Sequence, residues 1–213
     1  YIQPQDPEEF LQLSCSANEA IEIATAAVAE KYPEFKGKVK LVMLAVPSRS
    51  NVPQYQDLKN EIDQQVGRIN GKFSEVNWSP VWYFYRSMPF ENLIDLYTSS
   101  QVALLTPVRD GMNLVCKEFI ASKLDKKGVL ILSEMAGSAY EMNEALLINP
   151  NNFEQQADTL KRAITMPEEE QMARNMFLQN RLKRYSVEVW ANEFMDSLKM
   201  QRKGIGTFVS QKL

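Results

Sequence analysis

Nearly unbroken apolar runs recur along the first two thirds of the chain. Four of them cover residues 39–46, 81–85, 102–106 and 129–133, and a weaker fifth run covers residues 145–149. Runs of this length and composition are typical of strands that are buried on both faces, as in a parallel sheet. We therefore predict a parallel sheet at the centre of the fold.

Segments with helical spacing lie between these apolar runs. Residues 55–69, 90–99 and 114–126 each carry apolar side chains three or four positions apart, as Leu58 and Ile62 do in the first of them. Strand and helix therefore alternate along the chain. This alternation predicts an α/β fold with a doubly wound parallel sheet.

The pattern changes after Pro150. Residues 153–165, 167–183 and 187–198 show helical spacing only, so we predict a helical C-terminal third. An Ala- and Glu-rich stretch at residues 18–31 predicts one more helix before the first strand.

The tail beyond residue 198 carries Gly204 and Gly206, which we expect to interrupt its structure and leave it poorly anchored. The chain shows no internal repeat, low-complexity tract or linker. We therefore expect residues 1–213 to form a single domain.

Composition excludes several classes of function. The net charge of -3 and the pI near 5.3, with acidic and basic residues interleaved, argue against nucleic acid or an anionic membrane as partner. The absence of histidine removes the commonest metal ligand and the commonest general base together, which disfavours metalloenzymes and Ser-His hydrolases.

Location is inferred from the apolar runs and the cysteines. No apolar run approaches the length of a membrane span, and the first residues do not form a signal sequence. Cys15 and Cys116 fit no zinc or redox spacing, and neither is predicted to be a nucleophile. We expect a cytoplasmic protein with no membrane partner.

The segment TPVRDGMNLVCKEF at residues 106–119 carries the most chemistry. An apolar strand ends there, a short turn with Gly111 follows, and an amphipathic helix begins at once. In open α/β sheets ligands bind at the carboxyl ends of the strands, and a helix N-terminus offers unpaired amides to an anion. Asp110 and Glu118 could flank such an anion and accept hydrogen bonds from sugar hydroxyls, which suits a nucleotide sugar.

A plainer interpretation of the same residues remains open. Asp110 or Asn113 could serve only as the cap of the helix, and Glu118 could be a solvated side chain near the positive end of the helix dipole. Gly111 could provide either a close approach to a ligand or a positive φ.

The sequence RDGMNLVCKEF at residues 109–119 closely resembles the donor-site motif of the trehalose-6-phosphate synthases, a family of retaining GT-B glycosyltransferases. Residues 45–73 and 129–152 resemble the same family in order and spacing, so the likeness is continuous over about residues 32–198. The ends, residues 1–20 and 200–213, do not resemble it. The resemblance implies that the chain is the carboxyl-terminal, Rossmann-like half of a GT-B fold.

The resemblance also implies roles for one group of residues in binding UDP-glucose or UDP. This predicted donor site consists of Asp110, Gly111, Met112, Asn113, Leu114, Val115 and Glu118. The Asp110 carboxylate would hold glucose hydroxyls as the catalytic residue, with the amides of residues 111–113 beside the sugar. The amides of residues 114–115 would meet the diphosphate, and Glu118 would accept both ribose hydroxyls.

Two further segments have alternative interpretations. Arg49 matches the family arginine that reaches the phosphate of the acceptor, although a solvated loop arginine is the plain alternative. Residues 133–141 follow a strand and contain Gly137, so they could border the donor sugar or form an ordinary loop.

The implied activity is transfer of glucose from UDP-glucose to glucose-6-phosphate, with retention and without a metal or other cofactor. The resemblance places much of the acceptor site in an amino-terminal half that this chain does not contain, so we expect donor binding without turnover. Gln3 and Pro4 stand where the family carries residues that neutralise the diphosphate. Two alternatives therefore stay open: a catalytically dead binding module, or an engineered stand-alone α/β domain.

The last predicted helix presents an apolar face formed by Val189, Trp190, Phe194 and Leu198. In the family this helix crosses to the other half of the enzyme. An apolar patch of that size is rarely left in water. We therefore expect the helix either to fold onto its own sheet or to pair with another molecule.

Overall fold

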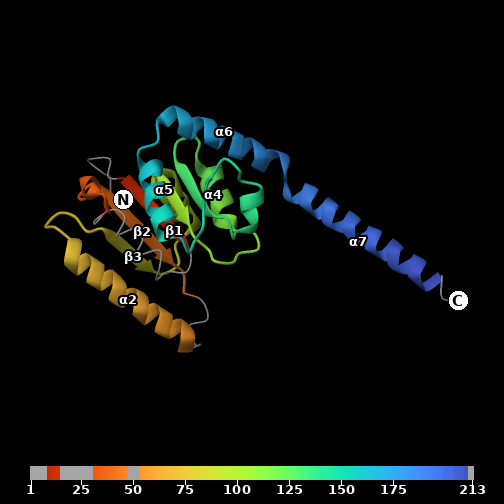
Figure 1. Cartoon of the computed structure of the whole chain (residues 1–213), viewed down its shortest axis with the longest axis horizontal. Helices are drawn as coiled ribbons and strands as arrows, with labels where there is room; N and C mark the ends of the chain where they lie inside the picture. Colours follow the sequence, from red (N-terminus) through yellow and green to blue (C-terminus); the bar gives the residue numbers. More distant parts are fainter. Residues whose placement is uncertain (1–8, 15–30, 48–52, 211–213) are drawn as a thin grey trace.

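The computed structural model describes residues 9–14, 31–47 and 53–210 (Figure 1). Their strands form one sheet in the order β3-β2-β1-β4-β5-β6, and every neighbouring pair is parallel. The predicted parallel sheet is confirmed. The strands are β1 (Glu9–Ser14), β2 (Val39–Ala45), β3 (Val81–Tyr85), β4 (Val102–Leu105), β5 (Val129–Ser133) and β6 (Leu146–Ile148).

Strand β1 was not predicted, although it lies near the middle of the sheet. Its Leu11 pairs with Leu41 of β2 on one side and with Val102 of β4 on the other. The sequence of β1, EFLQLS, is short and contains Glu9 and Gln12, so it does not read as the unbroken apolar run expected of a central strand. Its neighbours, rather than its own pattern, identify it as a strand.

The predicted helices are present with shifted ends. They are α2 (Pro53–Phe73), α3 (Phe90–Ser99), α4 (Leu114–Ser122), α5 (Phe153–Ile164), α6 (Glu168–Arg184) and α7 (Val187–Ser210), with short 3-10 helices η2 (Pro33–Phe35) and η3 (Gly137–Tyr140). The helix expected at residues 18–31 lies outside the described residues, apart from Lys31.

Two predicted helix ends were wrong. Helix α4 ends at Ser122 instead of residue 126, because Lys123 leaves the helical conformation, with φ -77° and ψ 77°. Helix α7 continues to Ser210, through Gly204 and Gly206. A glycine inside a helix costs about 1 kcal/mol but does not break the hydrogen-bond ladder as proline does, so the interruption expected there does not occur.

Helices cover both faces of the sheet. On one face, alternate strand residues such as Leu104 and Ile131 join a core cluster with α2 and α5. On the other face, the intervening residues such as Leu105 and Leu132 join a second cluster with α3, α4 and α6. This two-sided burial explains why β4 and β5 have no polar face.

The strand order reverses between β1 and β4. The chain passes from β1 outward to β2 and β3, returns through α3, and continues on the other side of β1 with β4, β5 and β6. Such a switch point leaves a crevice outside the carboxyl ends of the two central strands. The segment that follows β4 therefore begins beside this crevice.

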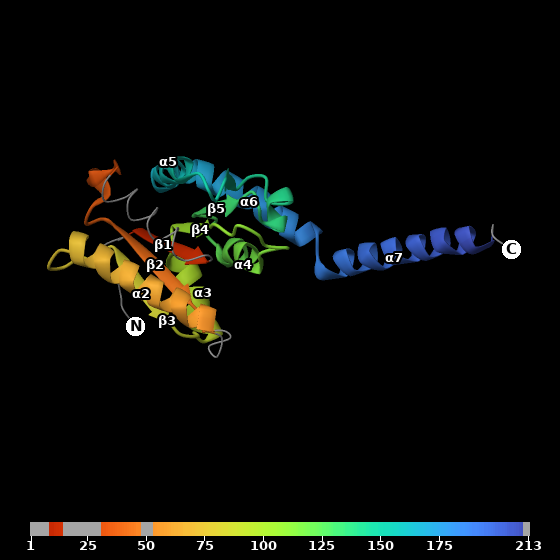
Figure 2. The same ribbon diagram turned by 60° about the horizontal axis from the view of Figure 1, so that its bottom comes forward.

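Helix α7 points away from the rest of the molecule in both views (Figures 1 and 2). It does not fold back onto the sheet, and Trp190 and Phe194 of its apolar face remain about half exposed, at 46% and 52%. One of the two arrangements expected from the sequence is therefore wrong. Within the described part of the chain, no helix combines the length and apolar character that crossing a membrane requires.

A buried lysine links the ends of α3 and α4. Lys123 is only 3% exposed, and its Nζ donates to the carbonyl oxygens of Thr98, at 3.1 Å, and Ser100. Burial lowers the pKa of this amine from 10.5 to about 8. The folded chain therefore releases the Lys123 proton at a lower pH than the unfolded chain does.

We expect Lys123 to give stability a defined pH dependence. Between pH 8 and 10.5 the unfolded chain binds the proton that the folded chain has lost, so stability rises with pH in this window. Relative to Lys123→Met, the wild type should gain up to about 3 kcal/mol across the window. Urea unfolding at a series of pH values measures the difference, with Lys38→Met, which removes an exposed amine, as the control. A constant difference between wild type and Lys123→Met would contradict the expectation.

Candidate functional site

The predicted donor segment lies where the fold places a ligand crevice. Residues 106–113 connect the carboxyl end of β4 to the first residue of α4, Leu114, beside the switch point. Within this connection Asp110 forms an isolated parallel bridge with Ala136, which follows β5. The turn is therefore held by a second loop at the same edge of the sheet.

Asn113 starts helix α4. Its side-chain Oδ1 accepts a hydrogen bond from the amide of Cys116 at 3.0 Å, and its backbone adopts φ 75° and ψ 90°. Asparagine tolerates a positive φ better than most residues and is a strong N-cap. Of the two candidates for the cap, Asn113 is the one observed, and the positive φ falls on it rather than on Gly111.

The Asp110 carboxylate braces the turn. Its Oδ1 accepts from the amide of Met112 and its Oδ2 accepts from Nδ2 of Asn113, both at 3.0 Å. An ionised carboxylate has about four lone-pair sites, so both oxygens can still accept a hydrogen bond from a ligand. Asp110 is half-buried.

The start of α4 presents two further groups. The amides of Leu114 and Val115 are the first two of the helix, and helix geometry leaves them without an intrahelical acceptor. Glu118 lies one turn further on, is exposed, and accepts a hydrogen bond from the Tyr97 hydroxyl at 3.0 Å. Backbone donors at a positive helix end therefore sit between the two carboxylates in the chain.

Residues 133–141 form a wall against this turn. The amide of Gly137 donates to the carbonyl of Asp110, and the amide of Ser138 donates to the carbonyl of Met112, both at 2.9 Å. A Cβ on Gly137 would lie 2.1 Å from the carbonyl oxygen of Gly111, whereas one on Gly111 would meet nothing within 4 Å. Sequence reasoning singled out Gly111, but the close approach between the loops requires glycine at 137.

An ion pair between Lys117 and Glu141 also connects helix α4 to residues 133–141. The Lys117 Nζ lies 3.0 Å from Oε2 of Glu141, and both side chains are largely shielded from solvent. This ion pair joins α4 to the end of η3. Residues 133–141 therefore contact both the turn at residues 106–113 and the helix that follows it.

Cys116 lies directly under the site but does not take part in chemistry there. It is fully buried, and burial raises the pKa of its thiol to about 11. A thiol with that pKa is not a nucleophile near neutral pH. Cys15, the other cysteine for which no nucleophilic role is predicted, lies outside the described residues.

Two expectations about the site stay predictions: that Arg49 contacts the acceptor phosphate, and that the reaction needs no metal. Arg49, predicted to reach the acceptor phosphate, lies outside the described residues. Across residues 9–14, 31–47 and 53–210 no group of three or more Cys, Asp or Glu side chains is arranged to hold a metal ion.

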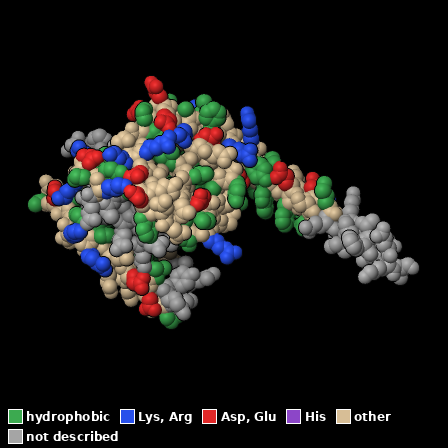
Figure 3. Space-filling model, in the orientation of Figure 1, with side chains coloured by type: hydrophobic (Ala, Val, Ile, Leu, Met, Phe, Trp, Pro, Cys, Tyr) green, Lys and Arg blue, Asp and Glu red, His purple; other side chains and the backbone are tan. Residues whose placement is uncertain are grey.

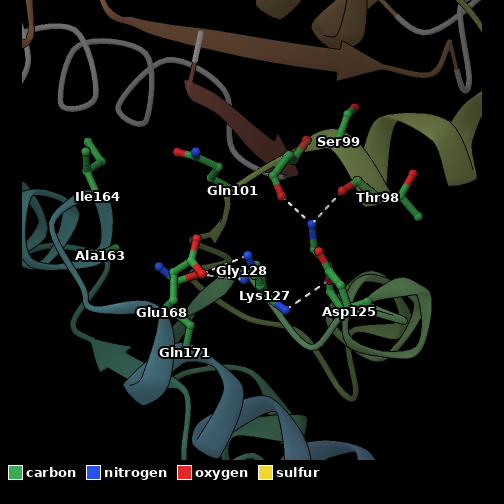
Figure 4. Close-up of a pocket in the computed structure, with 12 residues that line it drawn as sticks. Thr98, Ser99, Gln101, Asp125, Lys127, Gly128, Ala163, Ile164, Glu168 and Gln171 are labelled. Atoms are coloured by element: carbon green, nitrogen blue, oxygen red, sulfur yellow. Dashed lines mark hydrogen bonds and ion pairs between the residues drawn. The ribbon is translucent and has the colours of Figure 1, made fainter. Parts of the chain in front are cut away.

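A pocket of about 380 Å³ lies at the opposite edge of the sheet, where β4 and β5 begin (Figure 4). Two interactions cross its lining: Lys127 pairs with Glu168 at 2.7 Å, and the amide of Gly128 donates to Gln171 at 2.9 Å. Helix ends meet in this pocket, and it is separate from the turn at residues 106–113.

Comparison with known proteins gives one family. The model of Glycosyltransferase family 20 matches residues 23–200. The bifunctional trehalose-6-phosphate synthase/phosphatase of Thermoproteus tenax is 49% identical over 168 residues, which cover 79% of this chain and 23% of that protein.

Solved structures agree with the sequence match. An alpha,alpha-trehalose-phosphate synthase (UDP-forming) from Burkholderia vietnamiensis superposes with a TM-score of 0.85 and 36% identity, over 91% of this chain and 46% of that one. A structure from E. coli bound with UDP-2-fluoro glucose gives a TM-score of 0.84 and 34% identity, over 90% and 44%. The chain therefore spans less than half the length of these proteins, and the predicted fold, one half of a GT-B fold, is confirmed.

The close contact at Gly137 should make this position intolerant of any side chain. We expect Gly137→Ala to lower the free energy of unfolding by about 2–3 kcal/mol, because its Cβ would meet the Gly111 carbonyl. Gly111→Ala is the matched control, since its Cβ enters open space in the same turn. Urea unfolding of both variants measures the difference, and equal stability would show that the two loops separate without cost.

Proposed function

The chain belongs to glycosyltransferase family 20, and from this membership we propose that it forms the donor-binding half of a trehalose-6-phosphate synthase. The observation that carries the proposal is the turn between β4 and α4. In it, a braced carboxylate, the first amides of a helix and a second carboxylate follow one another at the carboxyl edge of the sheet. The proposed ligand is UDP-glucose, or UDP alone.

The diphosphate would bind at the start of α4. The amides of Leu114 and Val115 point out of the helix end, where the helix dipole favours an anion. The exposed side chains of Met112 and Leu114 lie beside them and could cover the ligand. The amides of residues 111–113 would approach the sugar, and Gly111 leaves open space on that side.

The two carboxylates, Asp110 and Glu118, would each bind the hydroxyl groups of one sugar, glucose or ribose. Asp110 is the proposed catalytic residue, and it would accept hydrogen bonds from glucose hydroxyls on the lone pairs that the turn does not use. Glu118, one helical turn beyond the phosphate amides, would accept both ribose hydroxyls. The turn that Asp110 braces is then the same turn that holds the ligand.

The proposed reaction belongs to a complete two-half enzyme. Glucose would pass from UDP-glucose to glucose-6-phosphate with retention and without a metal, and Arg49 would contact the acceptor phosphate. Transfer needs both substrates held in one oriented, water-poor cleft, so this half by itself should bind the donor without turning it over. The cytoplasmic location expected from the sequence stays a prediction.

Calorimetric titration with UDP and UDP-glucose tests the donor site. We expect Glu118→Ala to weaken the binding of both ligands, because both carry the ribose. Asp110→Asn should weaken UDP-glucose more than UDP, because both ligands lose the same brace of the turn but only UDP-glucose carries the glucose. Each loss should be about 10-fold, the size expected for one hydrogen bond to a charged group.

The controls separate binding from folding and from metal chemistry. Asp110→Asn keeps the size of the side chain but replaces one acceptor oxygen by a donor, so one of the two hydrogen bonds that brace the turn is lost. Thermal unfolding measures that structural cost separately from ligand binding, and EDTA should leave UDP binding unchanged. No binding of either ligand to the wild type would refute the donor site. Robust formation of trehalose 6-phosphate by this chain alone would refute the absence of turnover.

We also propose that, in this chain, α7 pairs with α7 of a second copy. Figure 3 shows apolar side chains gathered where α7 joins the rest of the molecule. Within the first half of α7, the rings of Trp190 and Phe194 stack with centroids 5.6 Å apart. A second copy that packs against this face would remove the half-exposed side chains of Trp190, Phe194 and Leu198 from water.

Sedimentation equilibrium over a range of protein concentrations tests this pairing. We expect a monomer–dimer equilibrium that Trp190→Ala weakens by at least about 10-fold, since large aromatic side chains dominate such interfaces. Phe177→Ala, which removes an exposed aromatic side chain from α6, should leave the equilibrium unchanged. A wild-type chain that stays monomeric at every concentration would rule the pairing out.

A further inference from the structure

Tyr97 holds the carboxylate of Glu118 from the neighbouring helix. The Tyr97 hydroxyl donates to Oε2 of Glu118 at 3.0 Å, and the two residues belong to α3 and α4. Tyr97 is 2% exposed, and its ring belongs to the core cluster beneath α3 and α4. The hydroxyl is therefore a fixed point, because the ring that carries it cannot move without opening the core.

The Glu118 side chain, unlike the buried Tyr97 ring, is free to move. It is exposed, and a glutamate side chain in solvent samples many rotamers. Binding a ligand with such a side chain costs the entropy of fixing it, about 0.5–1.5 kcal/mol. A hydrogen bond from a buried hydroxyl to one carboxylate oxygen removes part of that cost before the ligand arrives.

We infer that Tyr97 is a positioning residue, which presents the Glu118 carboxylate to the ribose diol of the nucleotide. The bond uses one lone pair of Oε2 and leaves Oε1 and the rest of Oε2 to accept. The inference rests on the proposed donor site, because it requires Glu118 to bind ribose. It adds a residue from α3, which lies outside the donor segment.

Tyr97→Phe tests the inference, because it removes one hydroxyl and keeps the ring in the core. We expect the affinity for UDP to fall about three- to tenfold, the equivalent of the ordering cost of one side chain. The affinity for 2′,3′-dideoxyuridine 5′-diphosphate, which has no ribose diol, should stay the same. Tyr97→Phe should also have no further effect on UDP binding when Glu118 is already alanine.

Tyr83→Phe is the matched control. The Tyr83 hydroxyl is buried without a partner among the described residues, and its ring packs on the core cluster of the opposite face of the sheet. Its removal should leave both affinities unchanged.

The outcomes distinguish the inference from the function on which it rests. If the wild type does not bind UDP, the proposed donor site itself is wrong. If the wild type binds UDP and Tyr97→Phe binds it equally well, the donor site stands and the positioning role is refuted. Equal weakening of UDP and the dideoxy analogue would show that Tyr97 only supports the fold, which also overturns the inference.

Discussion

The parallel pairing of β4 with β5 is the constraint on which the candidate site depends. Its register sets Leu104 opposite Ile131 and Leu105 opposite Leu132, so both strands end at the same edge of the sheet. The two segments that leave this edge, residues 106–113 and 133–141, must therefore run side by side. Their backbones then meet so closely that only glycine fits at 137.

The turn after β4 combines structural and binding chemistry in the same atoms. Asp110 accepts two hydrogen bonds from the turn, and Asn113 caps the helix whose first amides are the proposed phosphate donors. A site whose polar groups are already ordered does not have to reorganise when the ligand arrives. The interpretation of these residues as a capped turn is therefore compatible with their proposed role in binding. The hydrogen bonds that cap and brace the turn also hold the proposed binding groups in place.

Helix α7 lies away from the sheet because both faces of the sheet are already covered. The sheet is already covered on both faces by α2 and α5 and by α3, α4 and α6, so it has no apolar face left for α7. The apolar stripe of α7 consequently remains at the surface, where an exposed patch of this kind marks a site of association.

The sequence by itself determined the strands β2 to β6 and the helices between them, because burial on both faces or on one face imposes a periodicity that can be read directly. The donor motif was identified by its resemblance to a known family, and its role in binding is a proposal. The sequence did not identify β1, whose Glu9 and Gln12 break that pattern and whose place between β2 and β4 comes from pairing with neighbours. Contacts between distant segments were equally invisible: Gly137 against Gly111, and Tyr97 with Glu118. Only the tertiary structure decided these, because the distance between two residues in space is set by the register of the sheet and by helix packing, and no local pattern encodes either.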